Sequence, residues 1–225
     1  VINYSAGEKS ERLPFDATLI PYQIFAPGRV VDWSGLASII RAPAILKKEA
    51  RGIHLQSAIV AIDVPNCTVL AIQGGASYRQ TQFNRVLHGK RQPGSLFKPF
   101  VFLSAFTHGA EGRPVTSLTR VEGTLFEWKY EGQSWKPRNY EKQYEDYVTV
   151  RRALENSINV PTARLAQKVG IPNIVDTIRK SGIRSPIPEI PSISLGSTEV
   201  TPIELAEAYT TIARLGKGCD LRPFT

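Results

Sequence analysis

The feature that most constrains this chain is an apolar segment at residues 95–106 that carries a single lysine. The segment reads S-L-F-K-P-F-V-F-L-S-A-F, so a helix here is apolar on nearly every side. A helix that is hydrophobic all round belongs in the centre of a folded domain. Pro99 has no amide hydrogen to donate back to Ser95, and proline is tolerated in the first turn of a helix. The sequence therefore predicts a buried central helix with Ser95 at its N-terminus.

The composition is that of a globular domain. The chain has 225 residues, of which 42% are hydrophobic and 21% are charged, which suits one large domain with a substantial core. No apolar run approaches the roughly 20 residues that cross a bilayer, and the sequence contains no Met. We expect it to be part of a longer protein, with any signal or membrane anchor outside it.

The net charge of +8 raises the question of an anionic partner. The basic residues are scattered and form only short pairs, such as those at 47–48 and 151–152. No basic helix and no alternation of basic with aromatic residues indicates a nucleic-acid groove. We expect a solvated surface, with an anionic envelope surface as the second interpretation and no nucleic-acid partner.

The cysteines and histidines show no metal-ligand spacing. Cys67 and Cys219 lie far apart and permit one disulfide, which their positions alone do not decide. His54, His88 and His108 are also dispersed, so structural or surface roles are expected for them. We expect neither a metal nor a cofactor.

The first part of the chain differs from the rest. Residues 1–50 are interrupted by four prolines and have one helix-like stretch at 33–41, which predicts a linker or a domain remnant.

The β-rich runs at 57–63 and 68–72 flank a Val-Pro-Asn-Cys turn and predict a hairpin. Their nearly continuous apolar character predicts a sheet covered by helices on both faces.

The second half is mainly helical. Residues 111–147 are rich in Gly, Tyr, Trp and charge, which predicts irregular surface structure. Residues 201–204 predict a capping box for a helix that ends at Gly216. Three further capped helices are expected before it: one opened by Thr149 and ending before Ser157, one from Pro161 to Gly170, and one from about Asn173 to Gly182.

The start of the central helix carries a potential nucleophile and base. Ser95 and Lys98 are three residues apart, so they share a helix face and their side chains can touch. A serine hydroxyl becomes a good nucleophile when a base takes its proton. Burial and the positive end of a helix lower a lysine pKa from about 10.4 toward neutrality. Gly94 leaves room for a substrate carbonyl, and the Ser95 amide is a candidate oxyanion donor.

A second polar motif, Ser157-Ile158-Asn159, lies in the predicted break between two helices, where its side chains can project into a cleft. Each motif has a structural alternative. Ser95 can be a helix cap beside a surface lysine, and Asn159 can cap the helix begun by Pro161. Together, however, S-x-x-K and S-x-N match the paired motifs of serine penicillin-recognising enzymes.

Longer segments resemble class A penicillin-binding proteins from about Leu55 to the end of the chain. Besides the opening strand pair, three segments carry the resemblance: R-Q-P-G-S-L-F-K-P-F at 91–100, N-S-I-N-V-P-T at 156–162 and L-G-S-T-E-V-T-P-I-E-L-A at 195–206. The resemblance implies an α/β (α+β) fold, in which an antiparallel sheet is flanked by helices beside an all-helical subdomain. It implies a transpeptidase domain at residues 51–225.

The resemblance also implies a function. The protein would be a peptidoglycan D,D-transpeptidase that cross-links stem peptides ending in D-Ala-D-Ala, with the lipid-linked precursor as a further partner and β-lactams as covalent inhibitors. Ser95 would be acylated, Lys98 would be its base, Ser157 would relay a proton, and Asn159 would orient Lys98 and bind substrate. The implied location is the periplasmic face of the bacterial cell membrane, reached through an anchor outside this chain.

One departure from the family pattern affects this interpretation. The third family motif, K-T-G or K-S-G, is absent, because Lys217-Gly218-Cys219 lacks the hydroxyl; we expect that motif beyond Thr225 in the parent protein. Residues 35–43 resemble the tail of a glycosyltransferase domain, but no catalytic glutamate motif of that domain occurs here, so this activity is assigned at most to the parent.

Other functions remain open at this level. A D,D-carboxypeptidase or a β-lactamase shares the first two motifs. A β-lactam sensor domain would be acylated without cross-linking, and an inactive scaffold would not be acylated.

Overall fold

The computed structural model describes residues 2–6, 9–13, 56–79 and 81–222. The chain divides into two units, Val1–His54 and Leu55–Thr225. In the first unit, β1 (Ile2–Ala6) and β2 (Lys9–Leu13) pair as an antiparallel hairpin, which the sequence did not predict. The helix-like stretch at 33–41 lies outside the described residues.

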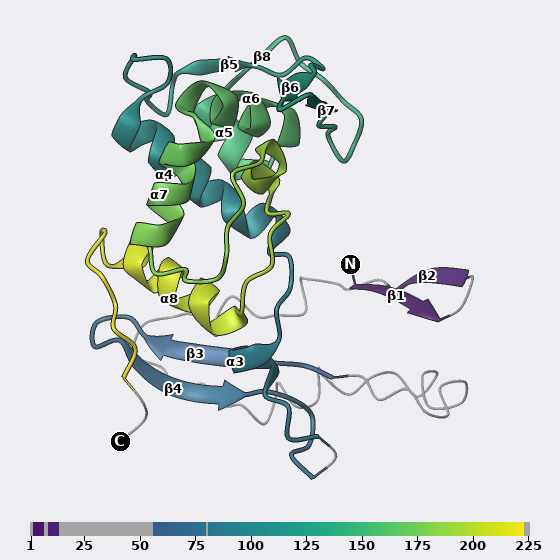
Figure 1. Cartoon of the computed structure of the whole chain (residues 1–225), viewed down its shortest axis with the longest axis vertical. Coiled ribbons are helices and arrows are strands. Elements are labelled where there is room, and N and C mark those ends of the chain that lie inside the picture. Colours follow the sequence, from purple (N-terminus) through teal and green to yellow (C-terminus); the bar gives the residue numbers. More distant parts are fainter. Residues whose placement is uncertain (1, 7–8, 14–55, 80, 223–225) are drawn as a thin grey trace. The chain divides into compact units, whose positions relative to one another are not determined.

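The second unit opens with the predicted hairpin. β3 (Ile59–Asp63) and β4 (Thr68–Gln73) are antiparallel, with a bulge between Ala61 and Ile62. Helix α8 (Pro202–Ala213) packs against this hairpin (Figure 1). The prediction that helices cover both faces of this hairpin is wrong for the described residues, because Leu70 and Ile72 of β4 are 53% and 41% exposed. A run of apolar residues indicates a surface suited to burial but does not identify what covers it.

A disulfide fastens this hairpin to the end of the chain. Cys67 in the β3–β4 turn bonds to Cys219, with their Cα atoms 5.6 Å apart, which settles the question that the sequence left open. Backbone hydrogen bonds run from Arg222 N–H to Cys67 O (2.8 Å) and from Val69 N–H to Arg222 O (3.1 Å). Arg214, just after α8, donates to the carbonyls of Val64 and Pro65 in the same turn.

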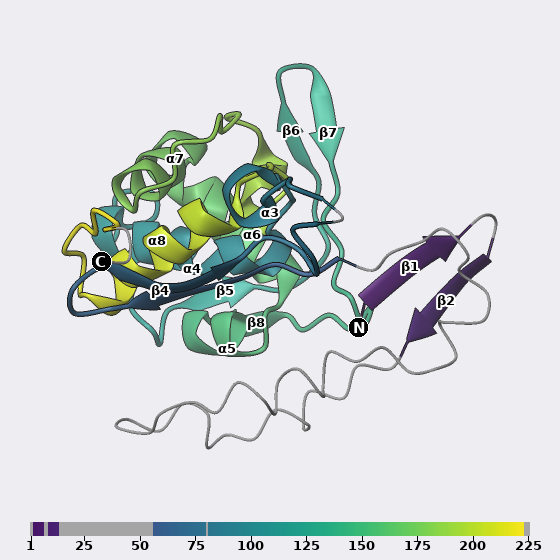
Figure 2. The ribbon, with the colours of Figure 1, turned by 90° about the horizontal axis from the view of Figure 1, so that it is seen from below.

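The predicted central helix is confirmed, but it is buried on part of its surface only, because Leu103 and Phe106 are 38% and 46% exposed. Helix α4 (Lys98–His108) follows a short 3-10 helix, η3 (Gly94–Phe97), so Ser95 lies in the tight turn that leads into α4. Phe97, Phe100 and Val101 are fully buried. Helices α5 (Val150–Glu155), α6 (Asn159–Val169) and α7 (Ile171–Lys180) gather with α4 in a layer on the side of α8 away from β3–β4 (Figures 1 and 2). Within the described part of the chain, no helix combines the length and apolar character needed to cross a bilayer.

The predicted helix boundaries hold to within three residues. Thr149 caps α5 by accepting a hydrogen bond from Arg152 N–H. Helices α6 and α7 each begin two residues earlier than expected, because Pro161 and Asn173 lie inside the first turn and do not set the first helical residue. Helix α8 stops at Ala213, and a further turn leads to Gly216.

Residues 111–147 contain more regular structure than the sequence indicated. Strand β5 (Arg120–Glu122) pairs with β8 (Tyr147–Thr149), and β6 (Trp128–Tyr130) pairs with β7 (Gln133–Trp135). The β6–β7 hairpin projects from the helical layer (Figure 2). Its two turn residues, Glu131 and Gly132, both have positive φ, as tight hairpins with this loop length favour.

The predicted capping box opens α8, and it includes a buried carboxylate. The side chain of Glu204 accepts hydrogen bonds from the backbone N–H and hydroxyl of both Thr201 and Ser185, and from Arg184 N–H. Burial raises the pKa of Glu204, but these hydrogen bonds, led by that from the Ser185 hydroxyl, outweigh burial and lower the pKa from 4.5 to about 2. The ionised carboxylate thus ties the loop at Ser185 to the start of α8.

We expect Glu204→Gln to lower the free energy of unfolding by about 1–3 kcal/mol at pH 7, because charge-assisted bonds are lost and buried donors are left poorly matched. A depressed pKa gives stability that is present above the ordinary value of 4.5 and is lost as pH falls toward about 2. Chemical denaturation at pH 7 and pH 3 measures both effects. Glu199→Gln, at an exposed carboxylate nearby, is the control, and an equal effect from the two variants would contradict the assigned role of Glu204.

Candidate active site

The η3–α4 junction places the first motif. Ser95 is exposed in the 3-10 turn, whereas Lys98, the first residue of α4, is only 1% exposed. The alternative interpretation of Lys98 as a surface lysine is therefore wrong. Within the described residues, no hydrogen bond joins Ser95 Oγ to Lys98 Nζ. The amine of Lys98 points to other acceptors.

Lys98 joins the two sequence motifs. Its Nζ donates to Ser157 O, to Ser157 Oγ (3.0 Å) and to Asn159 Oδ1 (2.6 Å). These acceptors come from the break between α5 and α6, 59 and 61 residues further along the chain. An ammonium group has three donors, and here each donor has one acceptor. The two motifs that the sequence paired are thus in direct contact through one amine.

The surroundings of Lys98 favour loss of its proton. Burial lowers the pKa of Lys98 from 10.5 to about 8. All three of its acceptors are neutral, so no carboxylate bonded to the amine opposes this shift. With a pKa near 8, about a tenth of the Lys98 side chains are uncharged at pH 7. The amine can therefore serve as a base near neutral pH.

Ser157 is held in an unusual backbone conformation. Its φ is 52°, in the left-handed region that glycine favours. Helix α5 ends here in a Schellman motif, with hydrogen bonds from Ser157 N–H to Leu154 O (3.0 Å) and from Ile158 N–H to Ala153 O (2.9 Å). A serine at this position costs about 1–2 kcal/mol relative to an ordinary conformation. The conformation lets both the carbonyl and the hydroxyl of Ser157 accept from Lys98.

Asn159 is fixed at both ends of its amide. Its Oδ1 accepts from Lys98, and its Nδ2 donates to the backbone carbonyl of Arg138 (2.9 Å). The alternative interpretation of Asn159 as a helix cap is wrong, because it is the first residue of α6. Asn139 satisfies the helix terminus instead, since its Oδ1 accepts from Val160 N–H (2.9 Å).

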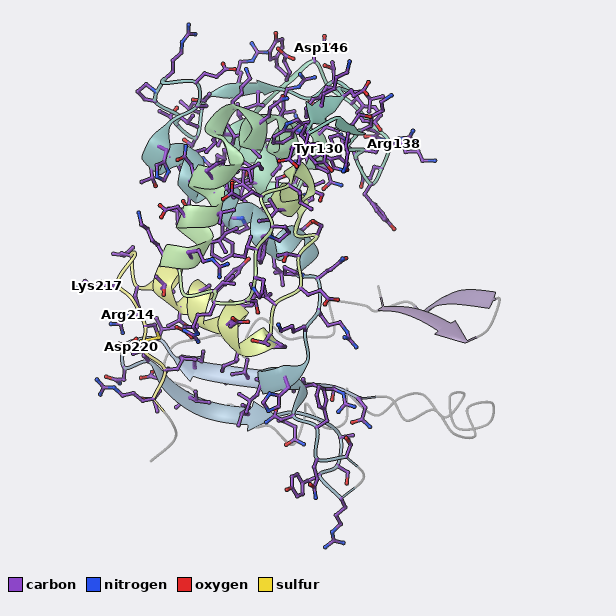
Figure 3. All side chains as sticks on the ribbon, viewed as in Figure 1. Tyr130, Arg138, Asp146, Arg214, Lys217 and Asp220 are labelled. Carbon is purple, nitrogen blue, oxygen red and sulfur yellow. A yellow bond between two sulfur atoms is a disulfide. The ribbon has the colours of Figure 1, made fainter. Side chains whose placement is uncertain are left out.

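Asn139 is a site residue that the sequence did not indicate. Besides bonding Val160, its Nδ2 donates to Gln143 O (2.7 Å), so one side chain folds residues 139–143 and fastens them to α6. Figure 3 shows Arg138 and Asp146, on the same loop, at the end of the domain opposite Arg214 and Asp220. Nothing local distinguishes Asn139 from other polar loop residues, because its partner Val160 is 21 positions away.

A cavity of about 630 Å³ lies over these groups. Ser95, Ser157 and Asn159 line it together with residues of the loop that Asn139 holds. The rest of its lining is mostly polar and includes both charges, from Glu141, Glu145 and Arg152, together with the apolar Val148 and Ile158. Glu145 and Arg152 form an ion pair across 2.8 Å. Across the described ranges, no three His, Cys, Asp or Glu side chains cluster in a way that suits a metal.

Comparison with known proteins identifies the family. Residues 57–222 match the family described as the penicillin binding protein transpeptidase domain. This chain belongs to that family. The match begins close to the start of the second structural unit at Leu55. The assignment of residues 1–50 to a linker or a glycosyltransferase remnant stays a prediction.

The relatives confirm the resemblance to class A penicillin-binding proteins. The chain is 39% identical over 171 residues to penicillin-binding protein 1B of Vibrio cholerae, covering 76% of this chain and 22% of that protein. It is 37% identical over 172 residues to penicillin-binding protein 1A of Aquifex aeolicus, covering 76% and 23%. The chain thus spans less than a quarter of the length of these relatives.

Solved penicillin-binding proteins share the fold. The crystal structure of penicillin-binding protein 1A from Haemophilus influenzae matches with a TM-score of 0.64 and 29% identity, covering 69% of this chain and 23% of that one. The PonA1 protein from Mycobacterium tuberculosis in complex with penicillin V matches with a TM-score of 0.59 and 25% identity, covering 76% and 46%. The predicted mixed fold of a penicillin-recognising serine enzyme is confirmed.

The strained conformation of Ser157 gives a test that separates stability from chemistry. We expect the free energy of unfolding of Ser157→Gly to be about 1 kcal/mol higher than that of Ser157→Ala, because glycine tolerates positive φ. Both variants lose the hydroxyl that accepts from Lys98, so we expect both to react with penicillin more slowly than the wild type. Denaturation and a penicillin-labelling time course measure the two effects. Equal stability of the two variants would contradict the proposed backbone strain at Ser157. A labelling rate equal to that of the wild type in both variants would contradict a role for the hydroxyl.

Proposed function

We propose that this domain is a peptidoglycan D,D-transpeptidase that acts through a Ser95 acyl-enzyme, within a larger penicillin-binding protein. The observation that carries the proposal is the buried Lys98 amine, which bonds both Ser157 and Asn159 beside the cavity that Ser95 lines. The family match supports the reaction class, and the relatives named penicillin-binding protein 1A and 1B favour a synthase. The proposed substrate is a stem peptide ending in D-Ala-D-Ala.

In the proposed first step, Ser95 Oγ attacks the carbonyl of the penultimate D-Ala while Lys98 takes the hydroxyl proton. A neutral lysine amine has two N–H donors and one lone pair, so deprotonation releases one of its three acceptors and frees a base for Ser95. The bond to the terminal D-Ala nitrogen then breaks, and Ser157 gives its hydroxyl proton to that leaving amine while Lys98 returns the proton taken from Ser95 to Ser157. An ester on Ser95 and free D-Ala result.

Backbone and amide donors suit the charge that develops in this step. The Ser95 N–H donates no hydrogen bond to another described residue, so it is free to stabilise the oxyanion. Asn159 uses one N–H of its amide on Arg138, which leaves the second for the substrate backbone. An amine from a neighbouring stem peptide then attacks the ester, which forms the cross-link and regenerates Ser95.

The remaining parts of the proposal concern the whole protein. We place the domain at the periplasmic face of a bacterial membrane, held by an anchor outside this sequence and acting on strands made from the lipid-linked precursor. The parent is proposed to be bifunctional with a glycosyltransferase, and to carry the third family motif on a further strand. β-Lactams would acylate Ser95, which the penicillin V complex of the related PonA1 protein supports.

We expect Ser95 to be the residue that a β-lactam labels. Fluorescent penicillin applied to the intact protein, followed by peptide mapping, should place the label on Ser95. Ser95→Ala should take none, whereas Ser134→Ala, at an exposed serine of β7, should label at the wild-type rate. Label on Ser157 would overturn the assignment, and an unlabelled wild type would favour an inactive scaffold. Labelling without cross-linking of stem peptides would favour a β-lactam sensor, and release of D-Ala to water would favour a carboxypeptidase.

Lys98 should act as a base rather than as a fixed charge. Because its pKa is lowered to about 8, the acylation rate of the wild type should rise with pH up to about 8 and level off above it. Lys98→Arg keeps the charge but cannot lose a proton in this range, so we expect acylation to slow by about a hundredfold or more. Lys129→Arg, at an exposed lysine of β6, is the control. A rate within a few-fold of wild type in Lys98→Arg would disprove the role.

A further inference from the structure

The segment that follows α7 holds the turn that carries Ser95. Gly196 ends the 3-10 helix η4 (Pro191–Leu195) in a left-handed conformation, with φ of 73°. Its carbonyl accepts a hydrogen bond from Gly94 N–H (3.2 Å). A Cβ on Gly196 would lie 2.1 Å from Gly94 O and 2.6 Å from Gly94 N. These are backbone atoms, so a side chain at Gly196 would displace the residue directly before Ser95.

Two further backbone contacts extend this close approach. Arg91 N–H donates to Val200 O (3.0 Å), and Val200 N–H donates to Arg91 O (3.1 Å). Residues 91–94 and 196–200 therefore run side by side between the helical layer and the β3–β4 hairpin, as Figure 1 also shows. The chain that leads into η3 is held along its length by the chain that leads into α8.

Helix α8 holds the other side of the same turn. The hydroxyl of Tyr209 donates to the carbonyl of Leu96 (2.8 Å). The Tyr209 ring packs edge-on against Phe100 of α4, with centroids 5.8 Å apart. The residue before Ser95 is thus bonded to Gly196 and the residue after it to Tyr209.

The Ser95 turn needs this outside support. Ser95 and Leu96 are both exposed, and the Ser95 hydroxyl bonds to no described residue. A nucleophile displaced by about 1 Å loses on the order of a hundredfold in rate. We propose that Gly196 and Tyr209 are positioning residues that hold Ser95 at the distance from Lys98 and the cavity that acylation requires. This inference rests on the proposed role of Ser95 as the nucleophile.

Gly112 offers a matched control for the glycine. It has the same φ of 73°, but a Cβ there would meet nothing within 4 Å. Alanine at either position meets the penalty of a positive φ, and only alanine at Gly196 presses on the Ser95 turn. We therefore compare Gly196→Ala with Gly112→Ala, and Tyr209→Phe tests the second contact without removing the ring.

The experiment is a single-turnover time course with fluorescent penicillin on the full-length protein, which separates the rate constant from the amplitude. We expect the acylation rate constant to fall at least tenfold in Gly196→Ala and several-fold in Tyr209→Phe, and to stay at the wild-type value in Gly112→Ala. The pH midpoint of acylation should not move, because the contacts of Lys98 are left intact. A merely structural role would lower the amplitude and leave the rate constant unchanged, which would overturn the inference.

The remaining outcomes also decide the question. If Gly196→Ala does not fold, the Tyr209→Phe variant decides. An acylation rate constant equal to that of the wild type overturns the inference, and a reduced rate constant supports it. Labelling of the wild type at Ser95 together with unchanged variants would overturn this inference alone. A wild type that takes no label at Ser95 would overturn the proposed function and this inference with it.

Discussion

The site depends on the burial of one amine. Lys98 lies at the start of a helix that contributes Phe100, Val101 and Phe102 to the core, and its ammonium group is removed from water without a carboxylate to neutralise it. An unpaired buried charge is costly, and the cost is reduced either by losing the proton or by supplying neutral acceptors. The protein supplies three neutral acceptors, and because none of them is a carboxylate, burial still lowers the pKa of Lys98 to about 8.

Each acceptor of Lys98 is fixed by structure beyond it. Ser157 accepts twice because the end of α5 places it in a left-handed conformation, and Asn159 accepts because its amide is tied to the loop at Arg138. Asn139 in turn ties that loop to α6. The cavity wall and the lysine environment are therefore parts of one hydrogen-bonded network, in which movement of the loop would also change the surroundings of the amine.

The sequence predicted features that arise from neighbouring residues. The apolar run with Pro99, the cap at Thr149 and the capping box at Glu204 are local patterns, and the structure contains all three. Several missed features join distant residues: the β5–β8 pair, the bond from Asn139 to Val160, and the close approach of Gly196 to Gly94. The β1–β2 and β6–β7 hairpins are local but were also missed. The sequence placed Ser95 and Lys98 on one helix face, but no hydrogen bond joins them in the described residues, and the Lys98 amine bonds acceptors on another segment.

The disulfide has a topological consequence. The bond between Cys67 and Cys219 joins residues 152 positions apart and closes a covalent loop that contains Ser95, Lys98, Ser157 and Asn159. Restricting the unfolded chain over a loop of this length contributes on the order of 4–5 kcal/mol in the chain-entropy model, and such bonds persist in oxidising compartments. A protease that cut the exposed loop around Tyr140 would leave both halves of the site attached to each other, so a nicked domain would keep its parts until the disulfide was reduced.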